Sequence, residues 1–84
     1  MVNDMNKISY LKNAYKTIIV YDKDTRKRIV EAINKIPQGD IKKLQGEKYT
    51  QLYRLRVGKY RIIYHIEQDE ILIAKIDTRG DVYK

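Results

Sequence analysis

The feature that most constrains the fold is a period-two pattern of apolar side chains over residues 52–66, LYRLRVGKYRIIYHI, with Gly58-Lys59 at its centre. Successive side chains of a β-strand point to opposite faces of a sheet, so this period is typical of strands. Glycine at the first loop position accepts the positive φ of a type II′ turn. The pattern therefore predicts a β-hairpin with strands at 52–57 and 60–66.

The predicted pairing gives the hairpin two unlike faces. One face is apolar and aromatic, and it carries Tyr53, Leu55, Val57, Tyr60, Ile62, Tyr64 and Ile66. The other face carries Arg54, Arg56, Arg61 and His65. In this register Arg56 lies directly opposite Arg61, and Arg54 lies opposite Ile63. Like charges placed opposite one another destabilise a sheet, so this pairing costs stability when no anion is bound.

A phosphate between Arg56 and Arg61 would reverse that cost, because each guanidinium can donate paired hydrogen bonds to it. We therefore interpret the basic face as a phosphate-binding surface. The alternative is that both arginines splay outward into water.

The rest of the chain supplies elements to cover the apolar face. Residues 7–10 predict a short first strand, and residues 71–76 predict a third strand of the meander. Residues 22–36 predict a helix capped by Asp22 or Asp24, with an apolar stripe at helical spacing.

Residues 11–21, LKNAYKTIIVY, are ambiguous because their end is rich in β-branched residues while their apolar spacing is helical. We favour a helix there. The expected fold is a single α+β domain over residues 1–84, with an N-terminal helical hairpin packed on one face of a small, mainly antiparallel sheet.

Charge and composition narrow the function. The net charge is +7, and residues 42–65 alone carry seven basic and one acidic side chain. Such a patch suits a polyanion, although a solvated basic surface is the plainer alternative. With no cysteine and one histidine, neither a disulfide nor a metal site is expected, and no cofactor is implied. The chain also lacks a membrane-spanning apolar run and a signal-peptide core, so a cytoplasmic protein without membrane contact is expected.

Several segments together resemble a known family. KKLQG, then LYRLRVGKYRIIY, an acidic turn and IAKIDTRGDVYK are similar in order and spacing to the toxins of bacterial RelE/ParE-type toxin–antitoxin pairs. The similarity extends back through KISYLKNAYK and DKDTRKRIVEAINKIPQGDIKKLQG, and it favours the helix over residues 11–21.

The resemblance implies an activity. RelE-like members are metal-independent endoribonucleases that cut messenger RNA, commonly in the ribosomal A site, by attack of the 2′-hydroxyl on the adjacent phosphate. By similarity, Arg61 matches an arginine on the scissile phosphate, Arg79 matches one that supports the developing charge, and Tyr83 matches a tyrosine that stacks on or orients the nucleotide.

The chain departs from the best-known ribonuclease of the family at Arg54 and Arg56, where that protein has lysines. Arginine does not exchange its proton in proteins, so these residues are expected to hold phosphate rather than to act as a base. Base catalysis would then fall to Tyr83, water or ribosomal RNA, and His65 is expected to be a sheet-face residue beside the site. Nonspecific phosphate contacts are expected from three lysines: Lys42, Lys43 and Lys48.

Two other functions remain open at this point. A ParE-like inhibitor of DNA gyrase would share the fold without ribonuclease activity, and a non-catalytic RNA- or ribosome-binding module would use the same basic face. The resemblance also implies a cognate antitoxin, growth inhibition when the toxin is expressed alone, and a toxin–antitoxin hetero-oligomer.

Overall fold

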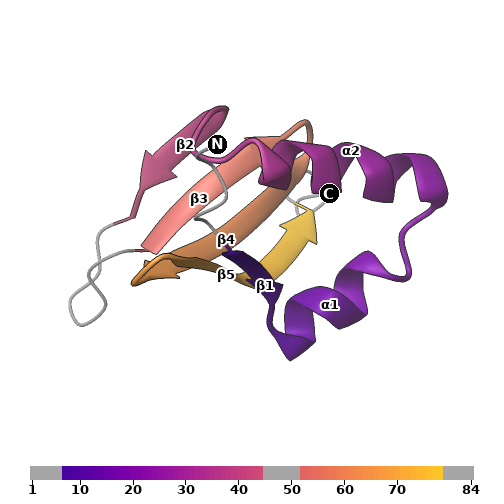
Figure 1. Cartoon of the computed structure of the whole chain (residues 1–84). Helices are drawn as coiled ribbons and strands as arrows, with labels where there is room; N and C mark the ends of the chain where they lie inside the picture. The colour runs from indigo at the N-terminus through magenta and orange to yellow at the C-terminus, as the bar shows by residue number, and fades with distance from the viewer. Residues whose placement is uncertain (1–6, 45–51, 79–84) are drawn as a thin grey trace.

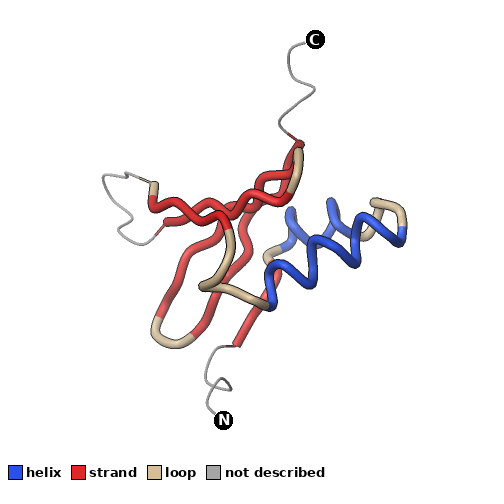
Figure 2. The backbone as a smooth tube through the Cα atoms, turned by 90° about the horizontal axis from the view of Figure 1, so that it is seen from above, coloured by secondary structure: helices blue, strands red, loops and turns tan. Residues whose placement is uncertain are grey.

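The computed structural model describes residues 7–44 and 52–78. These residues form two helices and five strands in a mixed sheet with the order β1-β5-β4-β3-β2 (Figure 1). In chain order the elements are β1 (Lys7–Tyr10), α1 (Lys12–Ile18), α2 (Lys23–Asn34), β2 (Asp40–Lys43), β3 (Leu52–Val57), β4 (Tyr60–Glu67) and β5 (Glu70–Thr78). Both helices lie on one side of the sheet (Figure 2). The predicted fold class is therefore confirmed.

The central hairpin has the predicted register. Arg56 pairs with Arg61, and Arg54 pairs with Ile63. Gly58 has a φ of 62°, which is the positive value that the first loop position requires. The period-two pattern and this one glycine were sufficient to predict the pairing.

Both predicted helices are present, with shorter bounds. The helix expected over residues 11–21 ends at Ile18, and Ile19 and Val20 follow it as exposed apolar residues. In α2 the carboxylate of Asp22 accepts hydrogen bonds from the backbone N–H and the hydroxyl of Thr25, which lower the pKa of Asp22. Asp22 is therefore the N-cap, one of the two predicted candidates.

The core lies between the helices and the sheet. Its buried side chains are Ala14, Ile18, Ile29, Ile33, Ile36, Leu55, Ile62, Tyr64, Ile71, Ile73 and Ile76. Full burial of one isoleucine or leucine side chain contributes roughly 1.5–3 kcal/mol to the stability of the fold. Tyr64 stacks on Tyr53 with ring centroids 5.4 Å apart, so the hairpin tyrosines pack, as predicted. Within the described residues, no helix is long and apolar enough to cross a membrane.

A register shift in the β4–β5 pair decides which side chains of β5 face outward. Ile62 pairs with Ile76 and Tyr64 pairs with Ile73, so the pairing skips a residue of β5. Buried residues therefore change from odd positions, Ile71 and Ile73, to an even one, Ile76. The β-bulge inserts one extra residue into β5, so beyond it the even-numbered side chains face the core and the odd-numbered side chains face outward.

Candidate phosphate-binding face

The sheet face opposite the helices carries most of the residues predicted for the site. We call it the open face and define it by eight of its polar residues: Asp40, Lys42, Arg54, Arg56, Arg61, His65, Lys75 and Asp77. The paired Glu67 and Glu70 lie on the same side, next to the β4–β5 turn. No helix of the described segments covers this face (Figure 2). The arginines of the hairpin therefore share one face, as the alternation predicts.

One row of the open face runs across four strands in the order acid, base, base, acid. Asp40 pairs with Arg56, Arg56 with Arg61, and Arg61 with Asp77. The Nε atom of Arg56 lies 3.8 Å from an oxygen of Asp40, and their side chains are 48% and 60% exposed.

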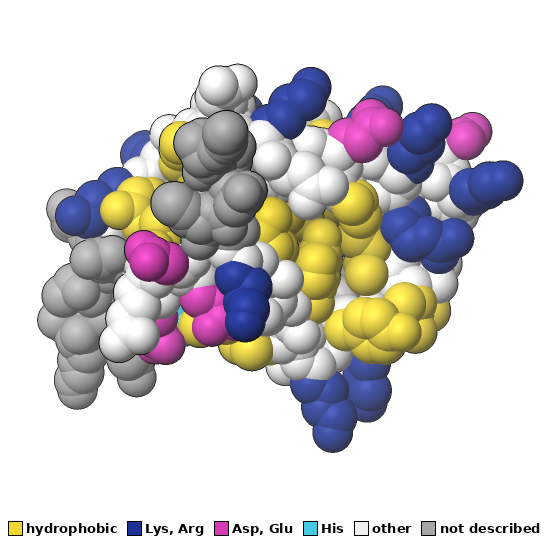
Figure 3. Space-filling model, in the orientation of Figure 1, with side chains coloured by type: hydrophobic (Ala, Val, Ile, Leu, Met, Phe, Trp, Pro, Cys, Tyr) yellow, Lys and Arg dark blue, Asp and Glu magenta, His cyan; other side chains and the backbone are white. Residues whose placement is uncertain are grey.

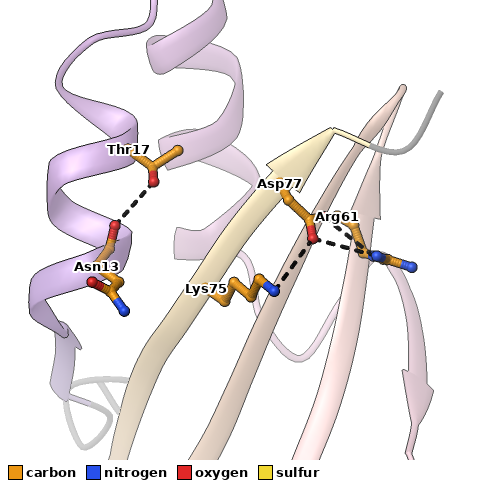
Figure 4. Close-up of polar contacts among 5 residues, drawn as sticks. All are labelled: Asn13, Thr17, Arg61, Lys75 and Asp77. Carbon is orange, nitrogen blue, oxygen red and sulfur yellow. Dashed lines mark hydrogen bonds and ion pairs between the residues drawn. The ribbon is translucent and has the colours of Figure 1, made fainter. Parts of the chain in front are cut away.

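At the other end of this row, the guanidinium of Arg61 is held by two hydrogen bonds. Its Nε and Nη2 atoms donate to Oδ1 and Oδ2 of Asp77, each at 3.3 Å. The Nζ atom of Lys75 lies 3.9 Å from Oδ2 of the same carboxylate (Figure 4). Asp77 therefore contacts two cations, and its side chain is the less exposed partner of each pair.

These aspartates correct one sequence expectation. The opposed arginines were expected to destabilise the sheet unless an anion lay between them. The register instead supplies a carboxylate outside each arginine, so the four side chains of the row have no net charge. The two carboxylates therefore lower the electrostatic cost of the like-charge pair without a bound anion.

The next row holds three cations, one isoleucine and no carboxylate. Lys42 pairs with Arg54, Arg54 with Ile63, and Ile63 with Lys75. The Nε atom of Arg54 is buried and has no hydrogen-bond partner among the described residues. Three cations and no carboxylate in this row give the open face its positive charge.

The lysines predicted as phosphate contacts do not share one position. Lys42 lies in the cationic row, whereas Lys43 pairs with Tyr53 and so lies on the helix side of the sheet. Adjacent residues of a strand face opposite ways, and the sequence analysis predicted no strand over these residues. Lys48, Arg79 and Tyr83 lie outside the described residues.

His65 occupies a third row, between Leu52 and Leu72. Its Nδ1 atom lies 3.9 Å from an oxygen of Glu67. Four residues of strand separate it from Arg61, which at a rise of ~3.3 Å per residue is roughly 13 Å. His65 is therefore a sheet-face residue, as predicted.

Lys75, Asp77 and Asp40 are the open-face residues that sequence reasoning missed. A signal was present for the first two, because an unbroken alternation from Ile71 and Ile73 would bury the charges of Lys75 and Asp77. Burying two such charges is costly, and a bulge avoids it.

A cleft of about 480 Å³ adjoins the Asp40–Arg56 end of the row, between α2 and strands β2 and β3. Its charged lining residues are Arg28, Glu31, Lys35, Asp40 and Arg56. In the described part of the chain, no cluster of three or more His, Asp or Glu side chains is suited to hold a metal ion.

Comparison with known proteins now gives the family. The family model described as the ParE toxin of type II toxin–antitoxin systems matches residues 8–83. A putative toxin RelE1 of Methanocaldococcus jannaschii is 39% identical over 69% of each chain.

Two solved complexes share the fold. The archaeal RelE–RelB complex of Pyrococcus horikoshii superposes with a TM-score of 0.76 at 28% identity, covering 92% of this chain and 98% of that one. The RelB–RelE antitoxin–toxin complex of Methanococcus jannaschii gives a TM-score of 0.70 at 30% identity, covering 88% and 93%. Because an archaeal protein is among these relatives, the expectation of a specifically bacterial toxin is not supported. The chain belongs to the RelE/ParE superfamily of type II toxin–antitoxin toxins.

Proposed function

We propose that this toxin is an endoribonuclease that cleaves messenger RNA, in association with the ribosome, on the open face of its sheet. The observation that carries the proposal is the Arg56–Arg61 pair, which is partly exposed on a helix-free face beside a row with three cations and no carboxylate. A phosphodiester strand laid across this face would meet both arginines together with Lys42, Arg54 and Lys75.

The proposed reaction is an attack of the ribose on the adjacent phosphate of the same strand. The 2′-oxygen attacks the adjacent phosphorus and gives up its proton, a new O–P bond forms, and the P–O5′ bond breaks as the 5′-oxygen gains a proton. Products are a 2′,3′-cyclic phosphate and a 5′-hydroxyl. In this scheme Arg61 binds the scissile phosphate and stabilises the charge that develops on its oxygens.

The resemblance assigns two further catalytic roles. Arg79 supports the charge or the leaving oxygen, and Tyr83 orients the nucleotide. Arg54 and Arg56 hold phosphate and exchange no proton. Tyr64 is unsuited as a base because burial, with a contribution from Tyr53, raises its pKa to about 12.

A second candidate is inhibition of DNA gyrase, and the ParE description of the matching family model favours it. The names of two relatives, RelE1 and RelE3 of Methanocaldococcus jannaschii, favour the ribonuclease instead. RelE3 is 41% identical over 52% of this chain and 48% of its own length. The hairpin arginines also favour the ribonuclease, because binding a protein target does not need a phosphate site.

The antitoxin partner suits a second surface, on α1. Within this helix and directly beside its two ends, four apolar residues are 40–74% exposed: Leu11, Tyr15, Ile19 and Val20. The first three recur every fourth residue and so follow one side of the helix, and Figure 3 shows hydrophobic side chains gathered over this helix. We assign this α1 stripe to antitoxin contact, because it lies away from the open face and can be covered without competing for RNA.

Brief induced expression of the toxin, followed by primer extension on cellular messenger RNA, tests the proposal. New 5′ ends that carry a hydroxyl, matched by upstream fragments with a 2′,3′-cyclic phosphate, are expected within minutes. Intact messenger RNA together with inhibition of supercoiling by purified gyrase would replace the proposal with the second candidate. Translation arrest with neither effect would indicate a non-catalytic ribosome-binding module.

A further inference from the structure

We propose that Asp77 is a positioning residue that holds the guanidinium of Arg61 at a fixed edge-on orientation toward the scissile phosphate. This inference rests on the proposed ribonuclease function. It concerns a residue that touches no substrate in the scheme above, and it explains why a carboxylate lies within a surface that binds an anion.

The geometry of the pair is that of a fork. Two nitrogens of Arg61 donate to two oxygens of Asp77, each over 3.3 Å, so the guanidinium plane is fixed by two contacts rather than one. A guanidinium has five N–H donors in a rigid arrangement, and this fork uses two of them. Nη1 has no hydrogen bond to any residue of the described segments and is available to a phosphate.

Asp77 has this position because of the β-bulge. An unbroken ladder would give it the parity of Ile71 and Ile73, which are buried. With the shift between β4 and β5, Asp77 instead pairs directly with Arg61 on the open face. The β-bulge therefore places a carboxylate beside Arg61. Figure 4 shows the resulting group of Arg61, Asp77 and Lys75.

Arg56, the other arginine of the row, has no equivalent pair of hydrogen bonds to a carboxylate in the described residues. The Arg56–Asp40 contact is a single one at 3.8 Å between two largely exposed side chains. Arg61 and Asp77 are 39% and 28% exposed, so solvent screens their interaction less. Arg61 therefore has the closer and less exposed carboxylate contact of the two arginines, which suits a contact of defined orientation on the reacting phosphate.

Removal of the Asp77 charge has two opposite consequences. The face becomes more positive, so RNA binds at least as tightly. The guanidinium loses its fixed orientation, so the chemical step slows, since small misplacements of catalytic groups cost one to two orders of magnitude in rate. A loss in kcat without a loss in RNA affinity is the signature of positioning.

The test uses Asp77→Asn in the full chain, with cleavage of messenger RNA measured in a translation reaction. Affinity is measured separately on a short 2′-O-methylated RNA, which lacks the attacking hydroxyl. Asp69→Asn is the matched control, because it makes the same charge change on the same hairpin, at the β4–β5 turn and roughly 20 Å along the strands. A third protein combines Asp77→Asn with Arg61→Lys.

The expected result is a drop in kcat of about tenfold for Asp77→Asn with equal or tighter binding of the methylated RNA, and wild-type kcat for Asp69→Asn. In the Arg61→Lys background the same change should cost less than about twofold, because Asp77 acts through Arg61.

Wild-type kcat in Asp77→Asn, or an undiminished loss in the Arg61→Lys background, would overturn the inference while leaving the ribonuclease intact. Absence of cleavage by the wild-type protein would overturn the ribonuclease itself. Should Asp77→Asn lose the wild-type circular dichroism and melting curve, Asp77→Ser replaces it. Unfolding of both variants would show that Asp77 is needed for the fold, and would also overturn the inference.

Discussion

Tyr64 is a buried phenol in the middle of the hairpin, and its ring stacks on that of Tyr53. Burial is the main cause that raises its pKa from 10.0 to about 12. The folded state therefore holds this proton more tightly than the unfolded state, and the associated stability is complete below pH 10. It is lost as the pH rises from about 10 to about 12.

Tyr64→Phe should remove this loss, because phenylalanine has no proton to release. We expect the melting temperature of the wild-type protein to fall more steeply across that pH range than that of the variant, in thermal melts followed by circular dichroism. Tyr15→Phe is the matched control, since the Tyr15 side chain is 55% exposed. Parallel curves for wild type and Tyr64→Phe would contradict the account of this side chain.

At the scale of elements, two glycines sit in turns and differ in how strictly they are required. Gly58 has a φ of 62°, a left-handed value that other residues reach at a cost of roughly 1–2 kcal/mol, and a Cβ there would meet only Arg28, at 3.8 Å. Gly39, just before β2, has a φ of 125°, and a Cβ there would lie 3.0 Å from the buried Leu55. Backbone strain and a steric conflict therefore combine at Gly39.

Gly39→Ala should destabilise the protein by roughly 2–4 kcal/mol, against roughly 1–2 kcal/mol for Gly58→Ala. Urea unfolding monitored by circular dichroism measures both. The order of the two values is the critical result, and a larger loss at Gly58 would be inconsistent with the structure.

The elements also show what the sequence could predict. Strands with a clear period and a glycine turn, such as residues 52–66, were predicted with their register, and β1 was predicted with its bounds. β2 was not, because its four residues, DIKK, hold one apolar side chain and sit at the sheet edge, where pairing rather than pattern defines a strand.

The candidate site was also predicted only where the sequence pattern is regular. The shared face of Arg54, Arg56 and Arg61 came from the alternation alone. The contact of Arg61 with Asp77 joins residues 16 apart in the chain and depends on a one-residue bulge, which a prediction of regular strands omits. The sequence signal for this bulge was that an unbroken alternation in β5 would bury the charges of Lys75 and Asp77.

At the scale of the whole molecule, two surfaces face different ways. The open face is cationic and free of described helices, whereas the α1 stripe is apolar and belongs to the helical layer. In the proposed function, RNA binds the open face and the antitoxin binds the α1 stripe. Changes in one should then leave the other intact.

Tyr15→Ser tests that separation, because tyrosine is enriched among the few interface residues whose truncation costs about 2 kcal/mol or more. We expect the affinity for the antitoxin encoded beside the toxin gene to fall about tenfold or more, with growth inhibition unchanged in the absence of antitoxin. Calorimetric titration measures the first and induced expression the second. Asn13→Ser, at an exposed polar position of α1, is the control; equal affinities for wild type and Tyr15→Ser would place the antitoxin elsewhere.

Arg61→Ala tests the central claim most directly, in one preparation assayed for folding, growth inhibition and messenger RNA cleavage. Loss of an exposed ion pair costs about 1 kcal/mol or less, so the melting curve should remain close to that of the wild type. Loss of a donor to the reacting phosphate should lower the cleavage rate by about 100-fold or more, while Arg28→Ala, which removes the same charge from α2, should cleave normally. A folded Arg61→Ala protein that cuts messenger RNA at the wild-type rate would contradict the account.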